Sequence, residues 1–212
     1  MPERFPRQGV YAITPDWLQG DALLAAVARA VAGGSVAVQY RAKSGSGRDR
    51  VAEAKGIRKI CRAAGIPLIV NDDPELARIV AADGVHLGRE DGAVAEARAL
   101  LGKEAIVGVS CYDSVDQACR AQAEGADYVA FGSFFPSRTK PSAPRARLGT
   151  LIEAKSRVSL PLVAIGGIDI DNASLLIGAG ADLIAVIEAV FAPADIARAC
   201  HLLKAIFPVS GR

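Results

Sequence analysis

The stretch Gly125-Ala126-Asp127-Tyr128-Val129-Ala130-Phe131 decides the fold class of this 212-residue chain, because two related stretches accompany it. Gly180-Ala181-Asp182-Leu183 follows the same plan, and Asp83-Gly84-Val85 is a shorter version of it. In each of them, a helix end and a glycine lead into a short apolar run that is typical of a strand. Repeats in which strands and helices alternate in this way favour a (β/α)8 barrel.

Short apolar runs with strand character alternate with helical patterns along the whole chain. Strands are expected near residues 9–13, 35–41, 67–70, 83–87, 105–109, 126–131, 161–165 and 182–187. This pattern predicts one α/β domain over residues 1–212, a TIM barrel with its active site at the C-terminal ends of the strands. A doubly wound open sheet is the alternative, but it would not place functional residue types after nearly every strand.

The composition excludes several classes of function. The formal net charge is only +2, so the chain lacks the strong field that would attract nucleic acid or a membrane surface. The most apolar stretch, residues 175–192, contains Asp182 and Glu188 and therefore does not predict a membrane span. No apolar signal segment follows Arg7, so a cytoplasmic location is expected. The cysteines lack metal-site or redox spacing, which predicts reduced thiols that serve packing: Cys61, Cys111, Cys119 and Cys200.

The strand expected at 35–41 runs into polar residues that share one face. Gln39, Arg41 and Lys43 alternate in the sequence, so a strand places them on the same side. The residues between and before them are expected to face the outer helices: Val36, Val38 and Tyr40. Buried positive charge requires a partner, and both Arg and Lys suit phosphate oxygens. This face therefore predicts an anion site at the barrel mouth, with a solvated strand end as the alternative.

Carboxylates follow the next two expected strands, in Asn71-Asp72-Asp73 and in Glu90-Asp91. Adjacent barrel strands would bring Asp72 and Asp91 within reach of one ion. Two carboxylates, together with phosphate oxygens and water, suit Mg²⁺. The alternative role for such residues is helix capping, which we assign to Asp73 and not to Asp72.

A basic segment and a glycine pair follow the later strands. Residues 136–147 contain no acid and carry the cations Arg138, Lys140, Arg145 and Arg147. Ser137 and Thr139 add hydroxyl groups, so the segment predicts a lid that closes over phosphate, with a solvated basic loop as the alternative. Gly166-Gly167 would let the backbone approach a ligand closely, and the N-terminus of the following helix would favour an anion.

The residues of an acid–base or covalent mechanism are missing from the sequence. No nucleophile stands beside a base, and His86 and His201 have no Ser, Cys or metal-ligand partner at an informative spacing, so we interpret both as structural. Cations, metal-binding carboxylates and hydroxyls instead suit the departure of a diphosphate, whose developing charge they would stabilise. Anion sites at both the early and the late strands imply two phosphorylated substrates, or one substrate with phosphates at both ends.

Taken together, these motifs resemble those of the thiamine phosphate synthase family. The motifs are Gln39-Tyr40-Arg41-Ala42-Lys43, Asn71-Asp72-Asp73, Gly84-Val85-His86-Leu87-Gly88-Arg89-Glu90-Asp91, Gly108-Val109-Ser110, Gly132-Ser133-Phe134-Phe135-Pro136-Ser137-Arg138-Thr139-Lys140 and Ile165-Gly166-Gly167-Ile168. The resemblance runs in order from about Tyr11 to Phe191 and covers nearly the whole chain. It implies a (β/α)8 barrel transferase that joins 4-amino-2-methyl-5-hydroxymethylpyrimidine diphosphate to a thiazole phosphate, giving thiamine phosphate and diphosphate.

The resemblance also implies roles for individual residues. Those that would hold or contact the pyrimidine diphosphate are Gln39, Arg41, Lys43, Asn71, Ser110 and Lys140. Those that would take a catalytic part are Arg41, Lys43, Ser110 and Lys140. Those that would border the thiazole phosphate are Ser137, Thr139, Gly167, Ile187 and Glu188. Asp72 and Asp91 would bind Mg²⁺, and the implied mechanism is dissociative: diphosphate leaves, a pyrimidine-stabilised cation forms, and the thiazole nitrogen attacks it.

Two positions depart from the pattern of the family. Ala42 stands where the family often has an acid, but it would face away from the site. Glu188 stands where a serine commonly follows the eighth strand, and a carboxylate would repel a phosphate there. We therefore expect the Glu188 side chain to point away, or to pair with a cation, while its backbone N–H serves the phosphate.

Three other classes of protein share some of these features. A thiazole tautomerase, which is a related barrel enzyme, would lack the metal carboxylates and would have a histidine where this chain has Ser133. A non-catalytic binder of phosphorylated thiamine precursors would not need Asp72 and Asp91. Other phosphate-handling barrels would require acid–base carboxylates or lysines at the strand ends. The expected partners are small phosphorylated substrates, not nucleic acid or membranes, and the formation of a homo-oligomer is left open, as is use of the carboxylated thiazole precursor.

Overall fold

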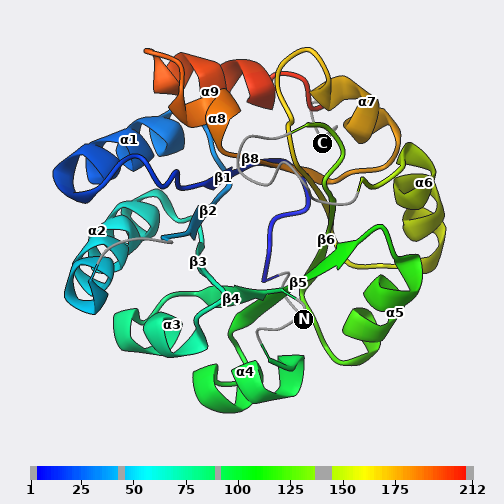
Figure 1. Ribbon diagram of the computed structural model, residues 1–212, viewed down its shortest axis with the longest axis horizontal. Coiled ribbons are helices and arrows are strands. Elements are labelled where there is room, and N and C mark those ends of the chain that lie inside the picture. Colours follow the sequence, from blue (N-terminus) through cyan, green and yellow to red (C-terminus); the bar gives the residue numbers. More distant parts are fainter. Residues whose placement is uncertain (1–3, 43–45, 89–91, 137–144, 209–212) are drawn as a thin grey trace.

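The structure is a computed structural model that describes residues 4–42, 46–88, 92–136 and 145–208. Over these residues, eight parallel strands close into a barrel in sequence order, from β1 to β8. Helices lie between successive strands and surround the barrel as a ring (Figure 1). The predicted (β/α)8 barrel is therefore confirmed. Pairing of β1 with both β2 and β8 closes the sheet and excludes the open doubly wound alternative.

The observed strands lie close to the predicted ranges. They are β1 (Gly9–Ile13), β2 (Ala37–Tyr40), β3 (Leu68–Asn71), β4 (Gly84–Leu87), β5 (Ile106–Tyr112), β6 (Tyr128–Gly132), β7 (Leu162–Ile165) and β8 (Leu183–Val186). The helices are α1 (Gly20–Ala32), α2 (Gly47–Ala64), α3 (Pro74–Val80), α4 (Val94–Leu101), α5 (Val115–Ala123), α6 (Leu148–Arg157), α7 (Ala173–Gly178), α8 (Glu188–Phe191) and α9 (Ile196–Lys204).

The inside of the barrel is filled by side chains that alternate with those facing the helices. Tyr11, Ile69 and Tyr128 belong to this interior cluster. Phe5, which precedes β1, completes it, because its ring stacks on Tyr128 at a centroid distance of 4.0 Å and lies edge-on to Tyr11 at 5.4 Å. Figure 1 shows this first segment running across the centre of the ring before it enters β1. The segment therefore closes the barrel at the end where the strands begin.

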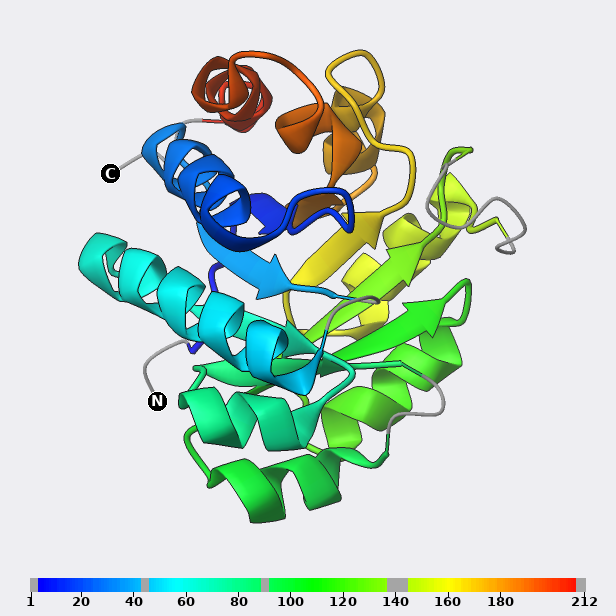
Figure 2. The same ribbon diagram turned by 60° about the vertical axis from the view of Figure 1, so that its left-hand side comes forward.

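The outer faces of the strands pack against the apolar faces of the helices. Val38 and Tyr40 point outward as predicted and belong to the same buried cluster as Leu23 of α1 and Ile57 of α2. Figure 2 shows α1 and α2 side by side on the outside of the barrel. The prediction for Val36 is wrong: this residue packs against the interior cluster, because it precedes β2 and lies outside its regular alternation.

The repeated aspartates that precede β4, β6 and β8 share one structural role. The carboxylates of Asp83, Asp127 and Asp182 each accept a backbone N–H near the start of the preceding strand, at 2.8, 2.8 and 2.9 Å. The backbone N–H of each aspartate also donates to the carbonyl of that same strand residue, at 3.0, 2.8 and 2.8 Å. We call these three residues the clasp aspartates. They join β3 to β4, β5 to β6 and β7 to β8 at the N-terminal end of the barrel.

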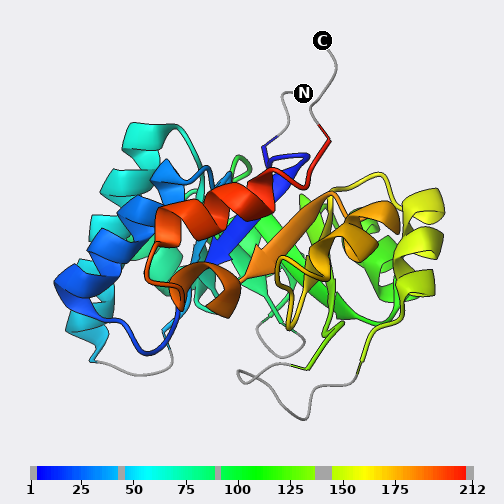
Figure 3. The same ribbon diagram turned by 90° about the horizontal axis from the view of Figure 1, so that it is seen from above.

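The two ends of the barrel carry different parts of the chain. In Figure 3, the segment before β1 and the end of α9 lie on one side of the barrel, and the loop between β1 and α1 lies on the other. The Gln8 side chain donates to the Pro208 carbonyl at 2.7 Å, which holds the first and last described segments together. Among the helices of the described residues, none is both long enough and apolar enough to cross a membrane.

Candidate active site

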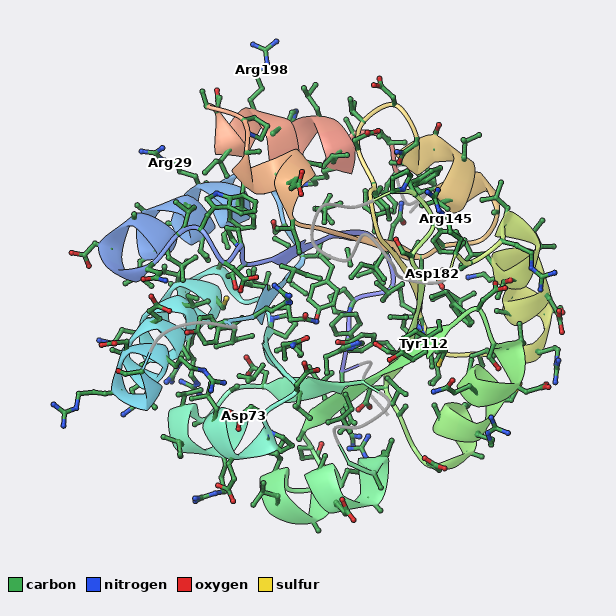
Figure 4. All side chains as sticks on the ribbon, in the orientation of Figure 1. Arg29, Asp73, Tyr112, Arg145, Asp182 and Arg198 are labelled. Atoms are coloured by element: carbon green, nitrogen blue, oxygen red, sulfur yellow. The ribbon has the colours of Figure 1, made fainter. Side chains whose placement is uncertain are left out.

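The candidate active site lies at the mouth of the barrel, where the C-terminal ends of the strands meet. Figure 4 shows side chains filling the centre of the ring, whereas the labelled Arg29 and Arg198 extend from α1 and α9 away from it. The predicted site residues that the structure describes are Gln39, Arg41, Asn71, Asp72, Ser110, Gly167, Ile187 and Glu188. They lie on, or directly after, β2, β3, β5, β7 and β8, so the parallel sheet gathers them at one end.

The remaining predicted site residues lie outside the described residues. These are Lys43, Asp91, Ser137, Thr139 and Lys140. Glu90 and residues 137–144, the greater part of the segment expected to form a lid, lie outside them as well. Their roles stay predictions from the sequence.

Arg41 is buried at the mouth, with only 8% of its surface exposed, although it carries a charge. The Thr14 hydroxyl accepts the Arg41 backbone N–H at 2.8 Å and donates to the Arg41 carbonyl at 3.0 Å. The Arg41 Nη1 group donates to Asp16 at 2.5 Å, while Nη2 is buried without a hydrogen-bond partner in the described part of the chain. An unpartnered buried donor costs about 1–3 kcal/mol, and more when it is charged. Arg41 therefore has a donor to offer to an anionic ligand.

Gln39 lies one layer below Arg41, at the floor of the mouth. Its side chain is 3% exposed and donates from Nε2 to the Tyr11 hydroxyl at 2.9 Å. The Tyr11 hydroxyl is in turn 2.9 Å from the Tyr128 hydroxyl. Gln39 thus links the residues at the mouth to the polar groups of the barrel interior.

The three consecutive residues after β3 have different roles. Asp73 caps α3, as predicted, because its carboxylate accepts the Leu76 N–H at 2.8 Å. Asp72 has a left-handed backbone with φ of 60°, which asparagine and aspartate tolerate better than most residues. Its N–H donates to the His86 carbonyl at 2.9 Å, and its exposed carboxylate accepts from Asn71 Nδ2 at 2.6 Å. The Asp72 carboxylate is therefore presented at the mouth and does not cap the helix.

Ser110 is in contact with a residue that sequence spacing did not connect to it. His86 Nε2 lies 2.8 Å from the Ser110 hydroxyl, and His86 Nδ1 lies 3.0 Å from the Tyr128 hydroxyl. The register between β4 and β5 places His86 beside Gly108, two residues before Ser110. Sequence spacing therefore gave no sign of this Ser partner of His86, because the contact depends on the register of two neighbouring strands.

The glycine pair after β7 is required by packing. Gly166 and Gly167 have positive φ angles of 104° and 63°. A Cβ on Gly166 would lie 2.0 Å from the Ser133 hydroxyl, and a Cβ on Gly167 would lie 2.3 Å from the Pro136 carbonyl oxygen. The close approach of the segment after β6 explains both glycines, and contact of Gly167 with a ligand stays a prediction. The following helix, α7, begins at Ala173, and the binding of an anion at its N-terminus stays a prediction.

Ile187 and Glu188 form the junction between β8 and α8. Ile187 precedes this short helix, and its carbonyl accepts the N–H groups of Val190 and Phe191 at 3.2 and 2.9 Å. Glu188 is the first helical residue and is half-buried. The structure therefore places both residues at the mouth, on the opposite side of β1 from Arg41.

Several residues of this site were missed from the sequence, namely Tyr11, Thr14, Asp16 and Tyr128. Thr14 and Asp16 directly follow β1, so the rule that residues after a strand reach the mouth would have found them. The two tyrosines lie inside strands and gave no such signal, because their role depends on which neighbours their hydroxyl groups meet.

Comparisons with known proteins agree with one another. A sequence model of the family described as thiamine monophosphate synthase matches residues 10–190. A protein of Methylococcus capsulatus named thiamine-phosphate synthase is 61% identical over 203 residues, which are 96% of this chain and 91% of that protein. A protein of the same name from Thiobacillus denitrificans is 53% identical over 199 residues, covering 94% of each chain.

A solved structure leads to the same family. The structure described as thiamine phosphate pyrophosphorylase from Pyrococcus furiosus superposes with a TM-score of 0.85 at 35% identity. The superposition covers 94% of this chain and 95% of the other. The resemblance inferred from the motifs is therefore confirmed: the chain belongs to the thiamine monophosphate synthase family.

Proposed function

We propose that this protein is a thiamine phosphate synthase, a transferase that joins 4-amino-2-methyl-5-hydroxymethylpyrimidine diphosphate to a thiazole phosphate or its carboxylated precursor. Membership of the family and the names of its similar relatives support this function. Within the site, the observation that carries the proposal is Arg41, a buried guanidinium at the barrel mouth whose Nη2 group is unpartnered among the described residues. Such a group suits the diphosphate of the first substrate.

The reaction depends on a stabilised leaving group and needs no base. The bond between the pyrimidine methylene carbon and the diphosphate oxygen breaks, and the oxygen keeps the electron pair. The pyrimidine-stabilised cation is then attacked by the lone pair of the thiazole nitrogen, which forms the new carbon–nitrogen bond. With the carboxylated precursor, the carboxylate also leaves as CO₂, and a proton from solvent takes its place. No proton has to be removed, in agreement with a site made of cations, hydroxyls and carboxylates.

Arg41 would stabilise the negative charge that grows on the departing diphosphate. Asp16 holds one edge of its guanidinium at 2.5 Å, and Thr14 fixes the backbone from which it projects. Donors that are already in place need little rearrangement during the reaction, and this is the main source of electrostatic catalysis. Lys43 and Lys140 would add positive charge, and Ser110 would add a hydroxyl donor.

Mg²⁺ is the cofactor in this proposal, held by Asp72 and Asp91 together with diphosphate oxygens. Asp72 fits this role because its carboxylate is exposed at the mouth, is supported by Asn71 and is not used as a helix cap. Carboxylate oxygens are hard ligands of the kind that Mg²⁺ prefers. When bound, the ion would neutralise part of the charge on the leaving group.

The thiazole phosphate would bind at the side of the mouth formed by β7 and β8. Gly167 and the backbone N–H groups at Ile187 and Glu188 lie on this side. Ser137 and Thr139 would complete the phosphate site. The Glu188 carboxylate would have to point away from the phosphate, because neighbouring negative charges repel each other.

Incubation of the pure protein with both substrates and Mg²⁺ tests the function directly. We expect thiamine phosphate and diphosphate in equal amounts. Arg29→Ala is a matched control, because Arg29 extends from α1 away from the barrel, and this variant should keep the activity that Arg41→Ala loses. Binding of the substrates without product would favour a non-catalytic binder, and conversion of the thiazole alone would favour a tautomerase.

A further inference from the structure

A continuous chain of hydrogen bonds crosses the barrel interior beneath the candidate site. It starts at Gln39 on β2, passes through the hydroxyls of Tyr11 and Tyr128, and reaches Ser110 on β5 through His86. The successive distances are 2.9, 2.9, 3.0 and 2.8 Å. We call these five residues the interior relay. It connects Gln39 on β2 with Ser110 on β5, two residues that the proposed function assigns to the same substrate.

The relay is shielded from water. Tyr11 and Tyr128 are fully buried, and Gln39 and His86 are nearly so. Desolvation by burial is the largest cause of the raised pKa of both tyrosines, so both phenols keep their protons near neutral pH. Each hydroxyl therefore has one proton that requires an acceptor, and an unsatisfied buried donor would be costly. This requirement limits the directions in which the bonds can run.

The Gln39 amide sets the direction of the whole relay. Its Nε2 group donates to the Tyr11 oxygen. In the described part of the chain, the Tyr11 hydroxyl has only Gln39 and Tyr128 as partners, so its own proton must be donated to the Tyr128 oxygen. The Tyr128 proton must then be donated to His86 Nδ1. A neutral imidazole that accepts at Nδ1 carries its proton on Nε2, and this proton is donated to the Ser110 oxygen.

We propose that His86, Tyr128 and Tyr11 are positioning residues that orient the Ser110 hydroxyl as a hydrogen-bond donor toward the leaving diphosphate. Because Ser110 accepts from His86 and its own proton has no hydrogen-bond acceptor in the described part of the chain, we assign that proton to an acceptor on the ligand. A donor that is oriented before the substrate arrives stabilises the developing negative charge at little cost in reorganisation. This inference rests on the proposed function, since it takes the diphosphate as the ligand of Ser110.

Neighbouring residues keep the Tyr128 ring in the position that the relay requires. A Cβ at position 108 would lie 2.0 Å from Cζ of Tyr128, so Gly108 provides the space for the phenol. Phe5 stacks on the Tyr128 ring at a centroid distance of 4.0 Å, and the His86 ring stacks on it at 5.5 Å. The rings are therefore fixed by packing as well as by hydrogen bonds.

The His86 tautomer is the first test. Long-range ¹H–¹⁵N correlation spectra of protein labelled at histidine nitrogen distinguish a proton on Nε2 from one on Nδ1. We expect the Nε2–H tautomer at His86 in the wild-type protein and a mixture of tautomers in Tyr128→Phe. The chain has two histidines, and His201, which is exposed on α9, serves as the internal reference. A wild-type proton on Nδ1 would reverse the relay and overturn the proposal.

A double-mutant cycle between Tyr128 and Ser110 is the second test. Tyr128→Phe removes the hydroxyl but keeps the ring, and we expect kcat to fall about tenfold, the size of one good hydrogen bond. The KM for the thiazole phosphate should stay unchanged. In a Ser110→Ala background, Tyr128→Phe should have little further effect, because the hydroxyl that it orients is gone. If the fold losses in kcat of the two single variants simply multiply in the double variant, Tyr128 does not act through Ser110.

Tyr40→Phe is the matched control for the loss of a buried hydroxyl. Tyr40 lies on the outer side of β2 and donates to Glu53 at 2.7 Å, so this variant leaves the relay untouched. We expect Tyr40→Phe to lower stability without lowering kcat. An equal loss of kcat in Tyr40→Phe and Tyr128→Phe would show that the loss comes from a general structural effect and not from the relay. If the wild-type protein made no thiamine phosphate, the proposed function would fail, whereas the His86 tautomer would still decide the direction of the relay.

Discussion

Thr14 and Arg41 exchange two hydrogen bonds where β1 and β2 end: the Thr14 hydroxyl accepts the Arg41 N–H at 2.8 Å and donates to the Arg41 carbonyl at 3.0 Å. Thr14 is fully buried, so water cannot replace it. One side chain therefore satisfies both backbone groups of Arg41, whose Nη2 group is unpartnered among the described residues.

Thr14→Val should lower the free energy of unfolding by about 2 kcal/mol or more, because it keeps the shape of the side chain but leaves two buried backbone groups without partners. Urea denaturation followed by circular dichroism measures this change. Thr14→Ser retains the hydroxyl and should lose much less. A valine variant as stable as the wild type would contradict the role given to this pair.

Arg41→Ala should reduce kcat/KM for the pyrimidine diphosphate far more than for the thiazole phosphate. A charge-assisted hydrogen bond is worth about 1.5–3 kcal/mol, so the loss should be roughly ten- to a hundredfold. Steady-state kinetics with each substrate varied in turn separate the two effects, with Arg29→Ala as the control. Equal losses of kcat/KM for both substrates would show that Arg41 at the end of β2 does not bind the diphosphate specifically.

Asp72→Ala and Asp73→Ala should affect different properties, activity and stability respectively, although the residues are adjacent. Asp72→Ala should abolish Mg²⁺-dependent turnover and leave the unfolding transition nearly unchanged. Asp73→Ala removes the cap of α3 and should cost about 1 kcal/mol of stability without changing the Mg²⁺ dependence. Activity is measured against Mg²⁺ concentration, and full wild-type turnover in excess chelator would rule out the metal. Asp91→Ala should behave like Asp72→Ala.

Glu188→Ser should change the KM for the thiazole phosphate little, or lower it modestly. The reason is that a carboxylate aimed at the phosphate would repel it, so the side chain should point elsewhere and its removal should be harmless. Initial rates with the thiazole phosphate varied measure this constant. A large rise in KM with an intact fold would show that Glu188 contributes directly, and the β8 side of the site would have to be reassigned.

The buried cysteines should resist alkylation in the folded protein. Burial raises the pKa of the Cys61 and Cys111 thiols to about 12, so almost none of the reactive thiolate is present at pH 8. Cys119 is only partly buried and should react first. Mass spectrometry after iodoacetamide treatment, with and without urea, follows each site, and rapid modification of Cys61 in the native state would contradict its burial.

The sequence was sufficient to predict the barrel, because each pair of strand and helix carries its own local pattern of apolar and capping residues. The apolar runs predicted the strands β1 to β8, and the assignment of Asp73 as a helix cap predicted the start of α3. The separation of Asp72 from Asp73 also followed from local rules, since only one of two adjacent residues can occupy the cap position.

What the sequence could not give depends on contacts between strands. His86 meets Ser110 only because β4 and β5 adopt a particular register, and no spacing rule contains that information. The Gly166-Gly167 pair was expected to lie against a ligand, which stays a prediction, but the sequence did not show that Ser133 and Pro136 of the preceding loop also approach it closely. A glycine in the sequence indicates that another group packs closely against the backbone, but it does not identify whether that group is a ligand or part of the protein.

The clasp aspartates have a consequence for how this protein can vary. Their bonds lie at the end of the barrel where the strands begin, and Arg41, Asp72 and Ser110 lie at the other end. Substitutions around the mouth therefore do not remove these bonds. A related protein can acquire a new specificity at the mouth while it keeps the clasp bonds at the opposite end of the barrel. Along the strands that these aspartates join, β3 to β8, stability should be more sensitive to substitution beside the clasp aspartates than at exposed positions of the mouth such as Asp72.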